Sequence, residues 1–160
     1  MAVSICLKIG KISGESVIKG HEKEIDVLAW SWGLSQSASA HISTGAGTGS
    51  ADVQDLHITK YVDAASPVLI QECFKGSDHK EATLTVKKVG GKTPIDMVKI
   101  TMSGTVFISS VHTGDAGADD RFTESVTLNF AKVKFEYTGQ TADQGKGASV
   151  SGEFNIAQKF

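Results

Sequence analysis

Apolar and polar residues alternate with a period of two through most of this 160-residue chain. A period of two places every second side chain on the same face of an extended strand, so the pattern predicts a mainly β fold. The strands expected from it are 3–9, 24–34, 53–61, 82–87, 95–102, 105–111, 123–138 and 150–156. We expect 95–102 and 105–111 to form a hairpin that turns at Ser103-Gly104.

The strand expected at 123–138 changes phase in its middle. Leu128 and Phe130 share one face, whereas Val133 belongs to the other parity. A change of phase moves the apolar side chains to the opposite face, so we expect a bulge or a bend between Phe130 and Ala131. A bent strand that serves two sheets is what a β-barrel or an orthogonal sandwich requires. Leu128 and Phe130 are therefore candidate core residues.

One segment has the period of a helix, and we expect one short α-helix at about Ser66–Lys75. Its apolar residues form pairs four positions apart, Leu69 with Cys73 and Ile70 with Phe74. Such pairs lie on one stripe of a helix. Ser66 is a good N-cap, Pro67 suits the first helical position, and Gly76 suits a left-handed stop.

A long stretch of small residues, Ser35–Ser50, follows neither period. It is long for a loop inside a compact domain, so we expect an extended loop that is either flexible or a contact element ordered by a partner. No internal repeat and no linker divides the chain, and we expect one domain over residues 1–160.

The charge and hydropathy of the chain argue against two kinds of partner. Sixteen Lys and Arg residues oppose eighteen Asp and Glu residues, the net charge is −2, and Arg121 is the only Arg. Nucleic-acid binding needs clustered cations, so nucleic acid is not expected as a partner. No apolar run approaches the ~20 residues of a membrane span, so no membrane insertion is expected. The first residues lack the pattern of a signal peptide, which predicts synthesis in the cytoplasm.

Motifs of enzymes, cofactor sites and metal sites are absent or incomplete. The glycines of 45–49 lack the GxGxxG spacing of a nucleotide loop, and no GxSxG motif is present. No two of the five histidines lie three to five positions apart, and two cysteines are too few for a disulfide framework. We expect no catalytic residue, no cofactor and no metal, and reduced cysteines. A metal site or a hydrolase site assembled in space stays an alternative.

Two tryptophans share one face of the strand expected at 24–34. Trp30 and Trp32 have the same parity, and Ser31 between them points the opposite way. Packing in the core is the favoured role for both rings, and stacking on a ligand is the alternative.

Several segments, in this order, resemble the haemolysin-coregulated protein (Hcp) family of bacterial type VI secretion systems. The segments are 9–16 (IGKISGES), 21–33 (HEKEIDVLAWSWG), 59–67 (TKYVDAASP), 82–88 (ATLTVKK) and 124–133 (ESVTLNFAKV). The resemblance covers nearly the whole chain and is weakest in 37–51 and 139–149.

The resemblance implies a two-sheet antiparallel β-barrel with one helix packed on its side. It implies that six copies form a ring, that rings stack into a hollow tube, and that a contractile sheath drives the tube out behind a spike. Small effectors would travel inside the ring. The protein would then be a structural tube subunit and not an enzyme, and it would leave the cell without a signal peptide.

The resemblance also implies roles for particular residues. Ser31 becomes the candidate contact to cargo in the ring lumen, and Trp30 and Trp32 would pack the barrel core. The extended loop would contact the neighbouring ring, and its candidate stacking residues are Ser37, His41, Ser43 and Gly47. The alternative is a monomeric β-barrel that binds a small ligand beside Trp30 and Trp32.

Overall fold

The computed structural model describes residues 2–41, 49–89, 93–114, 117, 120–142 and 145–158. Within this part of the chain there are ten strands and one helix. Their bounds are β1 (Ala2–Ile9), β2 (Ile25–Val27), β3 (Ala29–Ser31), β4 (Leu34–Gln36), β5 (Ala51–Val53), β6 (Leu56–Tyr61), α1 (Ser66–Lys75), β7 (Asp78–Val89), β8 (Ile95–Gly114), β9 (Thr123–Gln140) and β10 (Lys146–Asn155). The prediction of a mainly β fold with a short helix is confirmed. None of the described helical residues forms a span long and apolar enough to cross a membrane.

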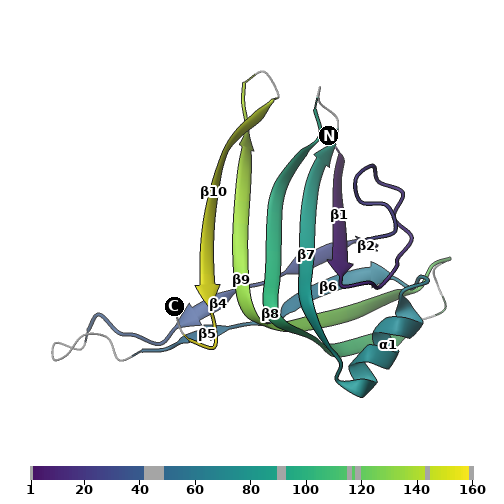
Figure 1. Ribbon diagram of the computed structural model, residues 1–160, viewed down its shortest axis with the longest axis horizontal. Helices are drawn as coiled ribbons and strands as arrows, with labels where there is room; N and C mark the ends of the chain where they lie inside the picture. Colours follow the sequence, from purple (N-terminus) through teal and green to yellow (C-terminus); the bar gives the residue numbers. More distant parts are fainter. Residues whose placement is uncertain are drawn as a thin grey trace.

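Eight strands form one antiparallel sheet that is nearly closed into a barrel (Figure 1). Its order is β2-β1-β7-β8-β9-β6-β3, and β10 pairs with β9. The sheet folds over on itself, so that β2 at one end lies against β6 near the other end. The predicted barrel is thus confirmed, and a small second sheet, β4-β5, stands apart from it.

The two long strands β8 and β9 carry the bend that divides the barrel into halves. Ser103 pairs with Lys132, and the next pair is Val106 with Phe130, so β8 has one residue more than β9 at this point. Gly104 occupies this bulge with φ +82°. The phase change expected near Phe130 is therefore real, but the extra residue lies on β8, opposite the predicted position.

The bend defines an upper and a lower half, as seen in Figure 1. The upper half contains β1, β7, β10, the first part of β8 and the second part of β9. The lower half contains β3, β6, the second part of β8 and the first part of β9.

Three strand predictions are wrong because local patterns do not identify the pairing partner. The strand expected at 53–61 is divided between β5, which pairs with β4, and β6, which pairs with β3 and β9. No hairpin turns at Ser103-Gly104, since β8 runs on without a break as Ile95–Gly114. A glycine with positive φ suits a turn and a bulge equally, and the continuous partner β9 makes it a bulge. The single strand expected at 24–34 is three short strands, because β2 pairs with β1, β3 with β6 and β4 with β5.

The core fills the space between the two halves of the barrel. Its fully buried side chains come from both halves and from the helix, and they include Leu7, Ile58, Leu69, Leu84, Ile100, Met102 and Leu128. The helix packs beside β8 and contributes Leu69 to this cluster. The two cysteines are free thiols, and burial raises the pKa of Cys6, so that thiol stays protonated at neutral pH.

The helix has the predicted bounds but not the predicted cap or stripe. Ala65 is the N-cap residue, and Ser66 is the first helical residue. The hydroxyl of Ser66 instead accepts a hydrogen bond from the backbone N–H of Asp63, at 2.9 Å. Gly76 ends the helix in the left-handed conformation, as predicted. Leu69 is fully buried whereas Phe74 is 92% exposed, so only half of the expected apolar stripe faces the core.

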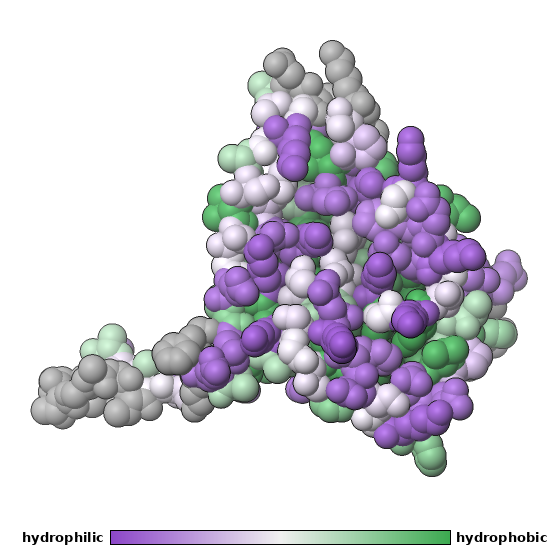
Figure 2. Space-filling view, viewed as in Figure 1, coloured by the Kyte–Doolittle hydropathy of each residue, from purple (hydrophilic) through white to green (hydrophobic). Residues whose placement is uncertain are grey.

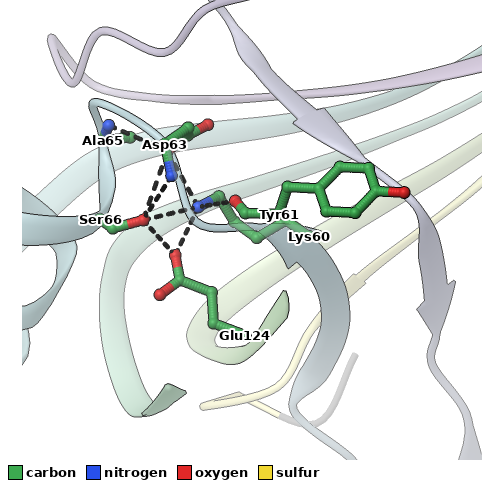
Figure 3. Close-up of polar contacts among 6 residues, drawn as sticks. All are labelled: Lys60, Tyr61, Asp63, Ala65, Ser66 and Glu124. Carbon is green, nitrogen blue, oxygen red and sulfur yellow. Dashed lines mark hydrogen bonds and ion pairs between the residues drawn. The ribbon is translucent and has the colours of Figure 1, made fainter. Parts of the chain in front are cut away.

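A buried group of charged residues joins the helix to the lower half (Figure 3). Lys60 on β6 and Glu124 on β9 are directly paired across the strands, and Lys60 Nζ donates to Glu124 Oε1. Lys60 Nζ also donates to Asp63 Oδ1 at 2.9 Å and to Ser66 Oγ at 3.1 Å. Ser66 Oγ donates to Glu124 Oε1 at 2.5 Å. The network holds the start of α1 against the pair β6-β9.

Candidate functional site

The outward side of the lower half carries a row of small polar side chains. Ser31 on β3 pairs with His57 on β6, His57 pairs with Thr127 on β9, and Thr127 pairs with Ser110 on β8. Residues paired across neighbouring strands project to the same side of a sheet. Val126 and Leu128, which flank Thr127, are fully buried, so this row faces away from the core.

Hydrogen bonds join this row to an adjacent carboxylate. Asp55 Oδ2 accepts from Ser109 Oγ at 2.7 Å, and Asp55 Oδ1 accepts from Asn129 Nδ2 at 2.9 Å. Thr127 Oγ1 lies 2.7 Å from Ser109 Oγ and 2.6 Å from Ser110 Oγ. Four side chains from β8 and β9 are therefore held in one arrangement with Asp55, which lies in the turn before β6.

We call this surface the hydroxyl face. It comprises Ser31, Asp55, His57, Thr59, Phe107, Ser109, Ser110, His112, Ser125, Thr127 and Asn129, none of which is buried. Asp55 is the only carboxylate among these residues, Asp78 borders them on β7, and none of them is Lys or Arg. The face is therefore polar and open, but almost without formal charge.

The outward side of the upper half is different, because it is rich in charge. Lys8, Lys99, Lys134 and Glu136 project there from strands whose alternate residues are buried. Lys134 Nζ lies 3.0 Å from Glu136 Oε1. Figure 2 shows hydrophilic side chains gathered over these upright strands. Charged residues are what a surface in bulk water normally carries. The hydroxyl face lacks them, which is typical of a surface that meets another molecule.

Behind the hydroxyl face, the candidate core residues pack together. Leu128 is fully buried and Phe130 is 5% exposed, while Trp30 and Trp32 are partly buried and pack against the core. The ring of Trp32 stacks with Phe135 at a centroid distance of 6.3 Å. Its Nε1 donates to the backbone oxygen of Gln54 at 2.9 Å. These contacts occupy the Trp32 ring in the way expected of a packed side chain.

The predicted extended loop begins and ends on the small second sheet. Strands β4 and β5 project sideways from the barrel (Figure 1), and we call residues 34–53 the arm. Ser50 N donates to Ser37 Oγ at 2.9 Å, which continues the pairing beyond the strands. Ser37 and His41 are both exposed on the arm. The candidate stacking residues Ser43 and Gly47 lie outside the described residues.

Two histidines outside the hydroxyl face, His21 and His79, have carboxylate partners. His21 Nδ1 lies 2.9 Å from Glu24 Oε2, and His79 Nε2 lies 3.4 Å from Glu72 Oε2. In the part of the chain that the structure describes, no group of three His, Cys, Asp or Glu residues is arranged to hold a metal ion.

Comparison with known proteins identifies the family. Residues 6–137 match the model of the family described as "Type VI secretion system effector, Hcp". The chain is 48% identical to Protein hcp1 of Pseudomonas aeruginosa over 159 residues, which cover 99% of this chain and 98% of that one. The chain belongs to the Hcp family.

Solved Hcp structures have the same fold. The crystal structure of Hcp1 from Salmonella typhimurium matches with a TM-score of 0.80 at 30% identity, over 99% of this chain and 98% of that one. A structure described as that of a type six secretion system protein matches with a TM-score of 0.91 over 99% of both chains. Its 24% identity supports the fold alone. The predicted resemblance to the Hcp family is confirmed.

Most of the hydroxyl face was not identified from the sequence of this Hcp-family chain. Ser31 was singled out, whereas Asp55, Ser109 and Asn129 were not. The available signal was the run of polar residues at alternate positions of 125–129. It could not show that Asp55 lies beside Asn129, because 74 positions separate the two residues.

Proposed function

We propose that this protein is the subunit of the inner tube of a type VI secretion system. Six copies close into a ring, rings stack into a hollow tube, and contraction of a sheath expels the tube behind a spike. Membership of the Hcp family supports this context. The protein acts as a structural component and not as an enzyme, and it leaves the cell with the expelled tube.

The hydroxyl face is the observation that carries the proposal. A channel that carries protein cargo needs walls without long charged side chains, because such side chains would narrow the channel. The hydroxyl face has mostly short polar side chains and no Lys or Arg, whereas the upper half carries both lysines and a glutamate. We assign the hydroxyl face to the lumen and the arm to the contact between stacked rings.

The oligomeric mass tests this assignment. Light scattering behind a sizing column should give one species of about six times the 16.9 kDa chain mass, because a closed ring satisfies every head-to-tail interface. A chain that stays monomeric at high concentration would contradict the ring. It would favour the alternative, a monomeric β-barrel that binds a small ligand near Trp30 and Trp32.

Replacing Ser31 with Gln should weaken retention of a cognate effector by about five- to tenfold, since roughly 1 kcal/mol corresponds to that change in affinity. Ser31 is exposed at the edge strand β3, and the longer side chain would project into the lumen. Co-purification of effector with the ring measures the effect. Ser13→Gln, on an exposed loop residue, is the matched control. Equal retention by Ser31→Gln and Ser13→Gln would refute the lumen contact.

A further inference from the structure

The hydroxyl face contains one large apolar side chain, the ring of Phe107. Val106 and Ile108 on either side of it in β8 are buried, so Phe107 points outward, and it is 37% exposed. It pairs with Asp78 on β7 and with Asn129 on β9. Asn129 donates to Asp55. One row across the sheet therefore runs Asp78, Phe107, Asn129, Asp55, so that Asp78 lies directly beside the ring and Asp55 lies on its other side, beyond Asn129.

Both carboxylates of this row are available to a cation. Neither Asp55 nor Asp78 forms an ion pair with a Lys, Arg or His among the described residues. Asp55 is oriented by the two hydrogen bonds that it accepts from Ser109 and Asn129. Each carboxylate oxygen accepts more than one hydrogen bond, so an oriented Asp55 can still bind a donor.

We propose that Phe107, with Asp78 beside it and Asp55 beyond Asn129, binds a basic side chain, Arg or Lys, of a protein that contacts the hydroxyl face. A cation over an aromatic ring is attracted by the negative face of the ring, and adjacent carboxylates add charge-assisted hydrogen bonds. The planar guanidinium of Arg suits both contacts best. The chain makes the same kind of contact within itself, since Arg121 lies 3.8 Å from the centroid of the Tyr61 ring.

This inference rests on the proposed function only for the identity of the binding partner, which would be cargo in the lumen of the ring. In a ring, each subunit would present one such site to the lumen, and the sites would select cargo segments with basic residues. A single subunit would bind a peptide with several basic residues more weakly than a ring does, because only one site is then available to it.

The test uses a fluorescein-labelled peptide that contains four Arg residues in a Gly-Ser background. A second peptide has citrulline, which is neutral and has nearly the same shape, in place of each Arg. Fluorescence anisotropy with the full-length protein should show tighter binding of the Arg peptide, and added salt should weaken it. Light scattering on the same samples records the oligomeric state.

Variants locate the binding on the row. Phe107→Leu and Asp55→Asn should each weaken binding of the Arg peptide by about two- to fivefold, the range for exposed cation–π contacts. Phe107→Tyr keeps the aromatic ring and should keep the affinity. This variant shows whether the loss in Phe107→Leu comes from the missing ring or from any substitution at this position. The matched controls are Phe74→Leu, on the exposed end of the helix, and Asp52→Asn, on the arm. Both should bind like the unchanged protein.

Two outcomes would overturn the inference. One is equal binding of the Arg and citrulline peptides, and the other is an equal loss with Phe74→Leu and Phe107→Leu. If the protein has the mass of a ring and gives either of these results, the basic-side-chain site is refuted and the proposed tube function still stands. A monomer that discriminates between the peptides would instead refute the ring and support the basic-side-chain site.

Discussion

Replacing Lys60 with Met should lower the free energy of unfolding by about 3–5 kcal/mol, the range for removing one partner of a buried ion pair. Lys60 is fully buried and Glu124 is 3% exposed. Methionine has nearly the same length but carries no charge, so the carboxylates of Glu124 and Asp63 would remain in the interior without their cation. Ser66 alone cannot compensate for two buried carboxylates.

Urea denaturation at one fixed protein concentration measures this effect, because assembly also stabilises the folded chain. The double variant Lys60→Met with Glu124→Met should recover much of the loss, since it also removes the unpaired Glu124 carboxylate. Lys134→Met is the matched control, because its ion pair with Glu136 is at the surface and contributes little. If Lys60→Met and Lys134→Met have the same unfolding midpoint, the buried network does not stabilise the fold.

Shortening the arm should prevent ring stacking and leave the ring itself intact. The variant replaces residues 38–49 by Asn-Gly, a sequence suited to a two-residue hairpin turn. Ser37 and Ser50 keep their hydrogen bonds to each other, and β4 and β5 keep their three paired positions. The barrel loses no core residue, but the projecting segment proposed to reach the next ring is gone. We expect tube yield to fall by about tenfold or more, equivalent to a loss of at least 1.4 kcal/mol per contact.

Cysteines introduced at the contact between rings lock stacked rings together, and electron microscopy then measures tube formation. Light scattering measures the mass of the ring. His41→Ala keeps the length of the arm and serves as the control, which should still form tubes. Normal tubes from the shortened protein would show that the arm does not make the contact between rings.

The helix illustrates what a local pattern can predict. Its bounds, Ser66–Lys75, and its stop at Gly76 match the structure, because helix periodicity and a left-handed terminal glycine depend on neighbouring residues. The N-terminus was predicted less well. Ser66 lies inside the helix and accepts from Asp63, because Lys60 and Glu124 position its hydroxyl from two other strands.

The buried charges were not predictable from strand patterns. Lys60 on β6 and Glu124 on β9 lie at positions whose side chains point into the core. Alternation alone predicts apolar residues at such positions. A charged residue on a strand normally faces solvent, and burial is tolerated here because the partner lies directly across the sheet. That partner is 64 positions away in the chain.

The β character of the chain, the helix, the extended loop and the family could all be predicted from the residues alone, because periodicity, turn chemistry and the order of segments are local or linear properties. Alternation also predicts that Ser31 and Trp30 point to opposite sides of the chain, which follows from the pleat of β3. Only the tertiary structure decided that β8 continues through Gly104 and that Asp55 joins Phe107, Ser109 and Asn129 on one face. Register between distant strands depends on the whole sheet, since each pairing is stabilised only when its neighbours are in place.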